Sequence, residues 1–104
     1  MRKNIVKHGQ EIGFVEYITA ADELQILDVY VRPEYRRQGL AKNALRELLA
    51  ENKNLANAYL EVRAANQPAL SLYAKLGFAR VGWRQAYYHN PVEDAVLMRR
   101  TLAS

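Results

Sequence analysis

Short segments of alternating apolar and polar residues occupy most of the chain. They predict strands over six segments: 4–7, 11–19, 24–31, 58–63, 79–88 and 94–100. The first two flank a turn at residues 8–10, and we expect Ile12, Phe14 and Tyr17 among the buried groups of the second. The pattern therefore predicts a protein built mainly on a β-sheet.

Two segments have the three-to-four spacing of helices. Leucine and alanine recur at that spacing between Leu40 and Asn52, among strong helix formers. A second helix is expected to start near residues 66–68, where an Asn-Gln-Pro sequence supplies a capping side chain and an early proline. It should end at Gly77, with Phe78 folding back onto its last turn.

The third predicted strand carries an irregularity. Its apolar residues Leu24 and Ile26 alternate correctly, but the phase slips before Val29 and Val31. One extra residue in a strand reverses the facing of all that follow, so the slip predicts a β-bulge between residues 26 and 29.

The order of these elements predicts the fold class. Three strands, a helix, a strand, a helix and two strands favour an α/β (α+β) sandwich with a mostly antiparallel mixed sheet. A wholly parallel sheet would need a crossover at every connection, and the chain has too few helices for that. At 104 residues, half of them apolar, residues 1–104 are expected to form a single domain.

Composition narrows the chemistry. The chain has no cysteine and two histidines, which excludes disulfides and thiolate chemistry, and no metal site is expected. A net charge of +4 favours anionic partners. Neither an 18-residue apolar run nor a secretory signal is present in the sequence, so we expect no membrane span and a cytoplasmic location.

The turn before the first helix is the most informative segment. Gly39 and Ala41 stand where the helix begins, beside the cations Arg36, Arg37 and Lys42. Free N–H groups at a helix N-terminus attract phosphate, and small residues let it approach the backbone. The alternative is a solvated basic turn with a glycine cap. The segment lacks both the Walker A and the GxGxxG patterns.

This turn resembles the acetyl-CoA signature of the GNAT superfamily of N-acetyltransferases, read here as Arg36-x-x-Gly39-x-Ala41. The segments 60–66, 69–78 and 87–98 are similar to bacterial ribosomal-protein-alanine N-acetyltransferases. Together the resemblance covers roughly residues 5–100, and it implies the GNAT fold with acetyl-CoA as cosubstrate.

The resemblance also implies site residues. Arg36 begins a cofactor-binding signature whose pyrophosphate loop consists of Arg37, Gln38, Gly39, Leu40, Ala41 and Lys42. The backbone of Val29, Tyr30 and Val31 would pair with the pantetheine arm, and Asn66 would also contact the cofactor. Glu61 matches the general base and Tyr73 the general acid.

Both catalytic assignments have a physical basis and a structural alternative. Glu61 lies between Leu60 and Val62 on a strand, so it points to the opposite face from both. Tyr73 lies two helical turns after Asn66, on the same face of the helix. A lone strand glutamate is more often solvated or ion-paired, and a tyrosine in an Ala/Leu helix is more often packed in the core.

We therefore expect acetyl transfer from acetyl-CoA to a protein N-terminal α-amine, directly in a ternary complex, and the resemblance implies a ribosomal protein as the candidate acceptor. A lysine or small-amine acceptor is one alternative, and a coenzyme A-binding module with weak or no catalysis is another. A small basic RNA-binding domain is a third, but RNA-binding signatures are absent from the sequence, so no direct nucleic-acid contact is expected.

Members of the resembled family carry a first strand and two helices before the segment that matches residues 4–7, whereas three residues precede Asn4 here. We expect one sheet face or edge to lack cover for this reason. Exposed apolar patches favour association, so a homodimer through the 4–7/11–19 hairpin is expected.

Overall fold

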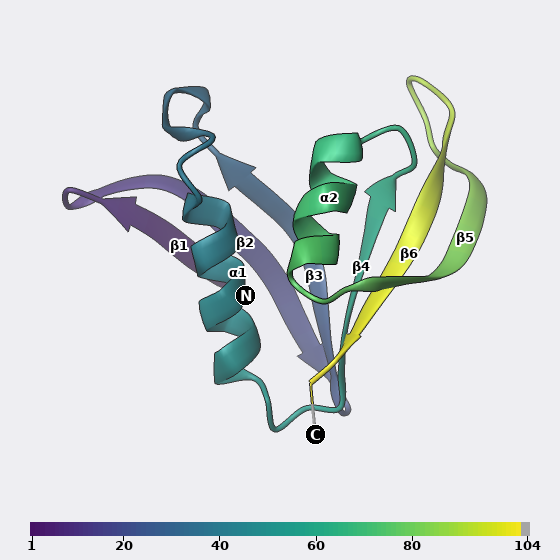
Figure 1. Cartoon of the computed structure of the whole chain (residues 1–104), viewed down its shortest axis with the longest axis horizontal. Coiled ribbons are helices and arrows are strands. Elements are labelled where there is room, and N and C mark those ends of the chain that lie inside the picture. Colours follow the sequence, from purple (N-terminus) through teal and green to yellow (C-terminus); the bar gives the residue numbers. More distant parts are fainter. Residues whose placement is uncertain (103–104) are drawn as a thin grey trace.

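One twisted sheet organises the molecule. The computed structural model describes residues 1–102, in which six strands lie in the order β1-β2-β3-β4-β6-β5 (Figure 1). The elements in chain order are β1 (Arg2–Lys7), β2 (Gln10–Ala20), β3 (Glu23–Val31), the 3₁₀ turn η1 (Pro33–Tyr35), α1 (Leu40–Glu51), β4 (Asn57–Arg63), α2 (Gln67–Lys75), β5 (Ala79–Tyr88) and β6 (Glu93–Thr101).

The predicted element order and fold class are confirmed. Within the described residues β3 and β4 run parallel, and all other neighbouring strands run antiparallel. The crossover between the two parallel strands is α1, which packs against β1, β2 and β3. Each predicted strand and helix ends within two residues of its expected position.

The bulge predicted in β3 is also confirmed. Glu16 pairs with Asp28, but the next residue, Tyr17, pairs with Ile26, so Leu27 is the additional residue. Leu24 and Ile26 are buried before the bulge, and Val31 is buried after it. The extra residue therefore keeps both halves of the strand facing the core.

A second bulge, in β2, was not predicted. Ile5 pairs with Gly13 while Val6 pairs with Glu11, which leaves Ile12 as the additional residue. The expected burial of Phe14 is wrong for this reason, because Val15 takes the core position and Phe14 is only half-buried. The Arg2 guanidinium covers the Phe14 ring at 3.8 Å.

Both ends of α2 follow the sequence signals. The Asn66 side chain caps the helix, its Oδ1 accepting a hydrogen bond from the Ala69 N–H at 3.2 Å. At the other end Gly77 adopts a left-handed φ of 90°, and the N–H groups of Gly77 and Phe78 donate to the carbonyls of Ala74 and Tyr73. This Schellman motif satisfies two carbonyls that the helix leaves unpaired.

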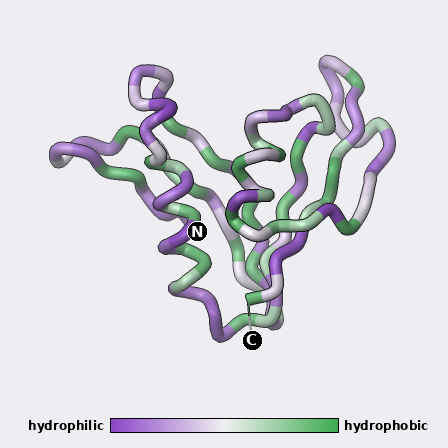
Figure 2. The backbone as a smooth tube through the Cα atoms, viewed as in Figure 1, coloured by the Kyte–Doolittle hydropathy of each residue, from purple (hydrophilic) through white to green (hydrophobic). Residues whose placement is uncertain are grey.

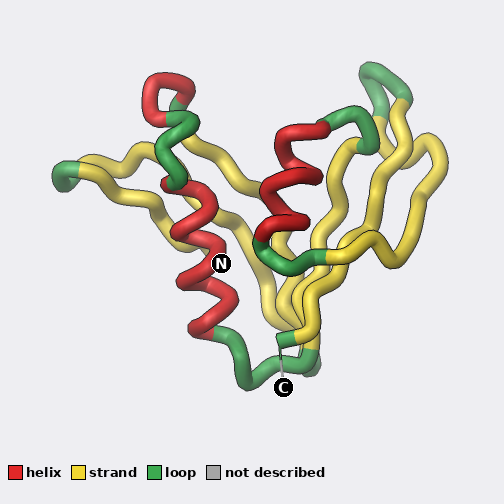
Figure 3. Tube along the Cα trace, viewed as in Figure 1, coloured by secondary structure: helices red, strands yellow, loops and turns green. Residues whose placement is uncertain are grey.

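Both helices lie on the same face of the sheet (Figures 1 and 3). Hydrophobic and hydrophilic positions alternate along the strands and along α1 (Figure 2), and the buried side chains of α1 are Ala44, Leu45, Leu48 and Leu49. On the sheet face away from the helices, Ile18 and Leu27 are 39% and 56% exposed. In the described part of the chain no helix is both long and apolar enough to cross a membrane.

Candidate active site

The sheet opens between its two parallel strands. Pairing of β3 with β4 ends at Ile26 and Leu60, and beyond that point the strands diverge around a cavity of about 590 Å³. Residues 27–31 of β3 line one side of this cavity and residues 61–63 of β4 line the other. The bulge at Leu27 lies where the divergence begins, so the irregularity in the sequence marks the mouth of the site.

Two further cavities adjoin the first. A cavity of about 470 Å³ at the start of α1 shares Val31, Arg36 and Ala41 with it. Another of about 460 Å³ shares Leu60 and Glu61. This third cavity is also lined by Tyr59 and Leu97, which lie on the sheet face opposite the helices. The gap between β3 and β4 can therefore be approached from both faces of the sheet.

The start of α1 presents free backbone donors. Gly39 is the N-cap residue with φ 75°, and no side chain among residues 1–102 caps this helix. Arg37 is also left-handed, with φ 64°. The N–H groups of the first turn therefore stay available, and Arg37 and Lys42 line the same cavity. Such an end favours an anion.

Two side chains of this turn are held by the protein itself. Arg36 Nε donates a 2.8 Å hydrogen bond to the Val31 carbonyl, which fixes the turn to the end of β3. The Gln38 side chain contacts Lys7 in the β1–β2 hairpin and is absent from the described lining of the cavities. The Gln38 side chain is therefore held by the hairpin and not by the cavities.

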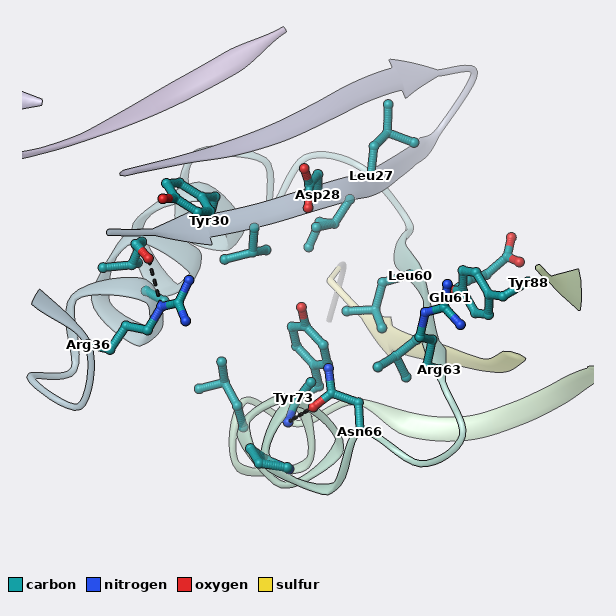
Figure 4. Close-up of a pocket in the computed structure, with 18 residues that line it drawn as sticks. Leu27, Asp28, Tyr30, Arg36, Leu60, Glu61, Arg63, Asn66, Tyr73 and Tyr88 are labelled. Atoms are coloured by element: carbon teal, nitrogen blue, oxygen red, sulfur yellow. Dashed lines mark hydrogen bonds between the residues drawn. The ribbon is translucent and has the colours of Figure 1, made fainter. Parts of the chain in front are cut away.

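Tyr73 projects from α2 into the first cavity, with its hydroxyl directed away from the helix (Figure 4). Burial, followed by the negative charge of Asp28, raises the pKa of Tyr73 to about 12. The phenol therefore remains protonated at neutral pH and can act there as a hydrogen-bond donor. Asn66 lines the same cavity, and because its oxygen caps α2, its amide NH₂ group is the part free to reach a ligand.

Glu61 lies at the junction of the first and third cavities. Leu60 and Val62 are buried, and Glu61 points to the other face, as expected from the alternation. Arg84 Nε lies 3.0 Å from Glu61 Oε2, but it is not aligned as a hydrogen bond. Oε2 is buried and accepts no hydrogen bond from the residues that the structure describes.

Tyr88 lies beside Glu61, at the end of the cavity away from Arg36 (Figure 4). Burial raises the pKa of Tyr88, and the charge of Glu61 raises it further. Arg63 covers the Tyr88 ring at 4.3 Å and pairs with Glu93 at 3.2 Å. These contacts fasten the β5–β6 end of the site to β4.

The structure thus brings together around the first two cavities the residues singled out from the sequence, apart from Gln38. Among the cavity residues that were not singled out from the sequence, Asp28 and Arg84 carry charges that bear on Tyr73 and Glu61. Asp28 could have been noted because it lies in the predicted bulge. Arg84 reaches Glu61 through the pairing of β4, β6 and β5, for which the sequence offers no signal. Residues 1–102 contain no group of three His, Asp or Glu side chains arranged for a metal ion.

Comparison with known proteins places these features in context. The model of the acetyltransferase (GNAT) family matches residues 4–78. The ribosomal protein bS18-alanine N-acetyltransferase of Escherichia coli is 35% identical over 98 residues, covering 90% of this chain and 66% of that protein. An N-alpha-acetyltransferase of Saccharolobus solfataricus is 44% identical over 80 residues, covering 74% of this chain and 47% of that protein.

The fold agrees with these similarities. The crystal structure of the ribosomal-protein-S18-alanine N-acetyltransferase from Escherichia coli superposes with a TM-score of 0.94 at 31% sequence identity. The match covers 100% of this chain and 70% of that one. The chain therefore spans about two thirds of the length of the Escherichia coli relative and about half of the Saccharolobus solfataricus relative.

Proposed function

The chain belongs to the acetyltransferase (GNAT) family, and from that premise we propose that it transfers an acetyl group from acetyl-CoA to a protein N-terminal α-amine. The observation that carries the proposal is the gap between β3 and β4. A carboxylate, Glu61, and a protonated phenol, Tyr73, both line the cavity there, and a helix N-terminus lies at the adjoining end.

The residues present suit acetyl-CoA. First-turn N–H groups of α1, with Arg37 and Lys42, would hold the pyrophosphate. The backbone of residues 29–31, unpaired on its β4 side beyond Ile26, would pair with the pantetheine arm, and the Asn66 amide would contact it from α2. Acetyl-CoA would supply the acetyl group as an activated thioester.

Glu61 and Tyr73 would handle the protons. The acceptor nitrogen forms a C–N bond to the acetyl carbon as the C–S bond breaks. Glu61 takes the proton that the nitrogen loses, and Tyr73 gives a proton to the departing sulfur. Both groups then return to their starting states by exchange with solvent. Backbone N–H groups near the Leu27 bulge would stabilise the negative charge that develops on the carbonyl oxygen.

The acceptor is proposed from the relatives. The Escherichia coli relative is named for the alanine of ribosomal protein bS18, and the Saccharolobus solfataricus relative for α-amine acetylation. The third cavity, on the other sheet face, gives an acceptor its own approach to Glu61. A ribosomal-protein N-terminus that begins with alanine is therefore the proposed acceptor. The homodimer and the lack of direct nucleic-acid contact remain predictions.

The proposal is tested by incubating the protein with acetyl-CoA and synthetic peptides. Release of the coenzyme A thiol measures turnover, and mass spectrometry of the peptides locates the acetyl group. A peptide that begins with alanine and contains one internal lysine should gain one acetyl group at its α-amine. The same peptide with a blocked N-terminus should gain none. Acetylation of the blocked peptide would instead identify a lysine acetyltransferase, and coenzyme A binding without turnover would identify a binding module.

Glu61→Gln provides the mechanistic arm of the same experiment. It should keep acetyl-CoA affinity and lower turnover by about 10²–10⁴-fold, the usual range for loss of a general base. Glu16→Gln is the matched control, because Glu16 forms a surface ion pair with Arg2 at 3.6 Å, on the β1–β2 hairpin. This control should retain full turnover.

A further inference from the structure

Arg84 reaches Glu61 across an intervening strand. Glu61 of β4 pairs with Leu97 of β6, and Leu97 pairs with Gly82 of β5, two residues before Arg84. The Arg84 side chain extends back over this row, and its Nε lies 3.0 Å from Glu61 Oε2. The proposed general base therefore has a positively charged neighbour that comes from a different strand.

The contact leaves Oε2 short of a donor. This oxygen is buried and accepts no hydrogen bond from the described residues, because the Arg84 N–H is out of line. A buried charged oxygen without a hydrogen bond is unfavourable. An acceptor α-ammonium carries three N–H donors and a positive charge. It could therefore satisfy Oε2 better than Arg84 does.

The Arg84 side chain can move away from Glu61. Its side chain is 54% exposed, and the Tyr87 ring, at 5.6 Å from its Cζ, offers a second surface for the guanidinium. An ion pair with an exposed partner adds little stability. The other two arginines that line the first and third cavities are fixed elsewhere, Arg36 on the Val31 carbonyl and Arg63 on Glu93.

The remaining titratable groups that line the first and third cavities do not replace Arg84. The acidic ones are Glu23 and Asp28 of β3, and the phenols are Tyr30, Tyr59, Tyr73, Tyr87 and Tyr88. None of these carries a positive charge, and the neighbouring β6 residue, Leu97, is apolar. Arg84 is thus the cation of the cavities that contacts Glu61.

We propose that Arg84 is a positioning residue, the resident counter-ion of Glu61 that an incoming acceptor ammonium displaces. The proposal rests on the proposed function. Before transfer the ammonium must give one proton to solvent water and become a neutral amine, because only the neutral form has a free electron pair. A displaced but nearby Arg84 disfavours the ammonium and so promotes that loss. Without it, Glu61 holds the ammonium more tightly and releases it to the neutral form less readily.

Steady-state kinetics with the alanine peptide at saturating acetyl-CoA test this, using Arg84→Gln and Arg84→Lys. We expect Arg84→Gln to lower KM for the peptide by about three- to tenfold and to lower kcat at pH 7.5. Free α-amines have a pKa of about 8, and the acidic limb of the kcat profile should move upward by about one pH unit. Arg84→Lys keeps the charge and should restore the wild-type profile.

Arg80→Gln is the matched control, since Arg80 is an exposed arginine on the same strand. It should leave KM, kcat and the pH profile unchanged. An Arg84→Gln variant with the wild-type KM and profile contradicts the proposal. So does a raised KM, or an equal loss in Arg84→Lys, because these indicate a structural or side-chain-specific role. Absence of turnover in the wild-type protein contradicts the proposed function itself, and the counter-ion proposal with it.

Discussion

Tyr73 packs edge-on against Phe78, with ring centroids 6.0 Å apart and planes at 67°. The contact spans the end of α2, where left-handed Gly77 turns the chain back so that the Phe78 N–H reaches the Tyr73 carbonyl. The same motif that ends the helix therefore braces the ring of the proposed general acid. Its hydroxyl is left directed into the cavity.

Replacing Tyr73 with phenylalanine should remove turnover and spare the fold. The ring contact with Phe78 survives, and within residues 1–102 the structure records no hydrogen bond to the Tyr73 hydroxyl. We expect kcat to fall by about 10²-fold or more, the usual contribution of an acid catalyst, with little change in melting temperature. Full turnover in this variant would remove Tyr73 from the mechanism. Tyr17→Phe, on β2, serves as the control.

The raised pKa of Tyr73 predicts a stability change at high pH. The phenol titrates near 10 in the unfolded chain and at about 12 in the folded protein. Its contribution to stability is therefore complete below pH 10 and is lost as the pH rises toward 12. Denaturant unfolding between pH 9 and 11.5 should show a steeper decline for the wild type than for Tyr73→Phe. Parallel curves would contradict the raised pKa.

Much of the fold was predictable because its signals are local. The phase slip between Ile26 and Val29 marks the β3 bulge, and Asn66 and Gly77 mark the ends of α2. Each of these signals acts over a few residues of chain, through side-chain facing, a capping hydrogen bond or a left-handed φ. The position of the site was predictable from the same signals, because its cavity opens at the bulge and Tyr73 lies between the two ends of α2.

The features that escaped prediction depend on pairing between distant segments. The alternation in β2 favours Phe14 as a core residue, and only the register with β1 shows that Ile12 is an additional residue. Arg84 contacts Glu61 because β6 lies between their strands, β5 and β4, in the sheet. The sequence contains no local signal for that strand order. Registers and strand orders of this kind are set by the packing of the whole sheet.

Gly39→Val should abolish acetyl-CoA binding for reasons beyond backbone strain. Gly39 and Gly9 share a φ of 75°, and a Cβ added at either would meet no atom within 4 Å. Valine at either position should cost a similar ~1–2 kcal/mol of strain, since both need the left-handed region. Only Gly39 adjoins the cavity, so calorimetry should show lost binding for Gly39→Val and normal binding for Gly9→Val. Equal acetyl-CoA affinities of the two variants would mean that the pyrophosphate binds elsewhere.

Asn66 offers a way to separate capping from cofactor binding within one side chain. Its Oδ1 caps α2 through the Ala69 N–H, whereas its NH₂ group is the part proposed to contact acetyl-CoA. Asn66→Asp retains the capping oxygen and adds a charge that a helix N-terminus favours, so stability should hold while acetyl-CoA affinity falls. Asn66→Ala should lose affinity and also about 1 kcal/mol of stability. Denaturant unfolding and calorimetric titration of both variants measure the two effects. Undiminished acetyl-CoA affinity in both variants would mean that Asn66 only caps α2 and does not contact acetyl-CoA.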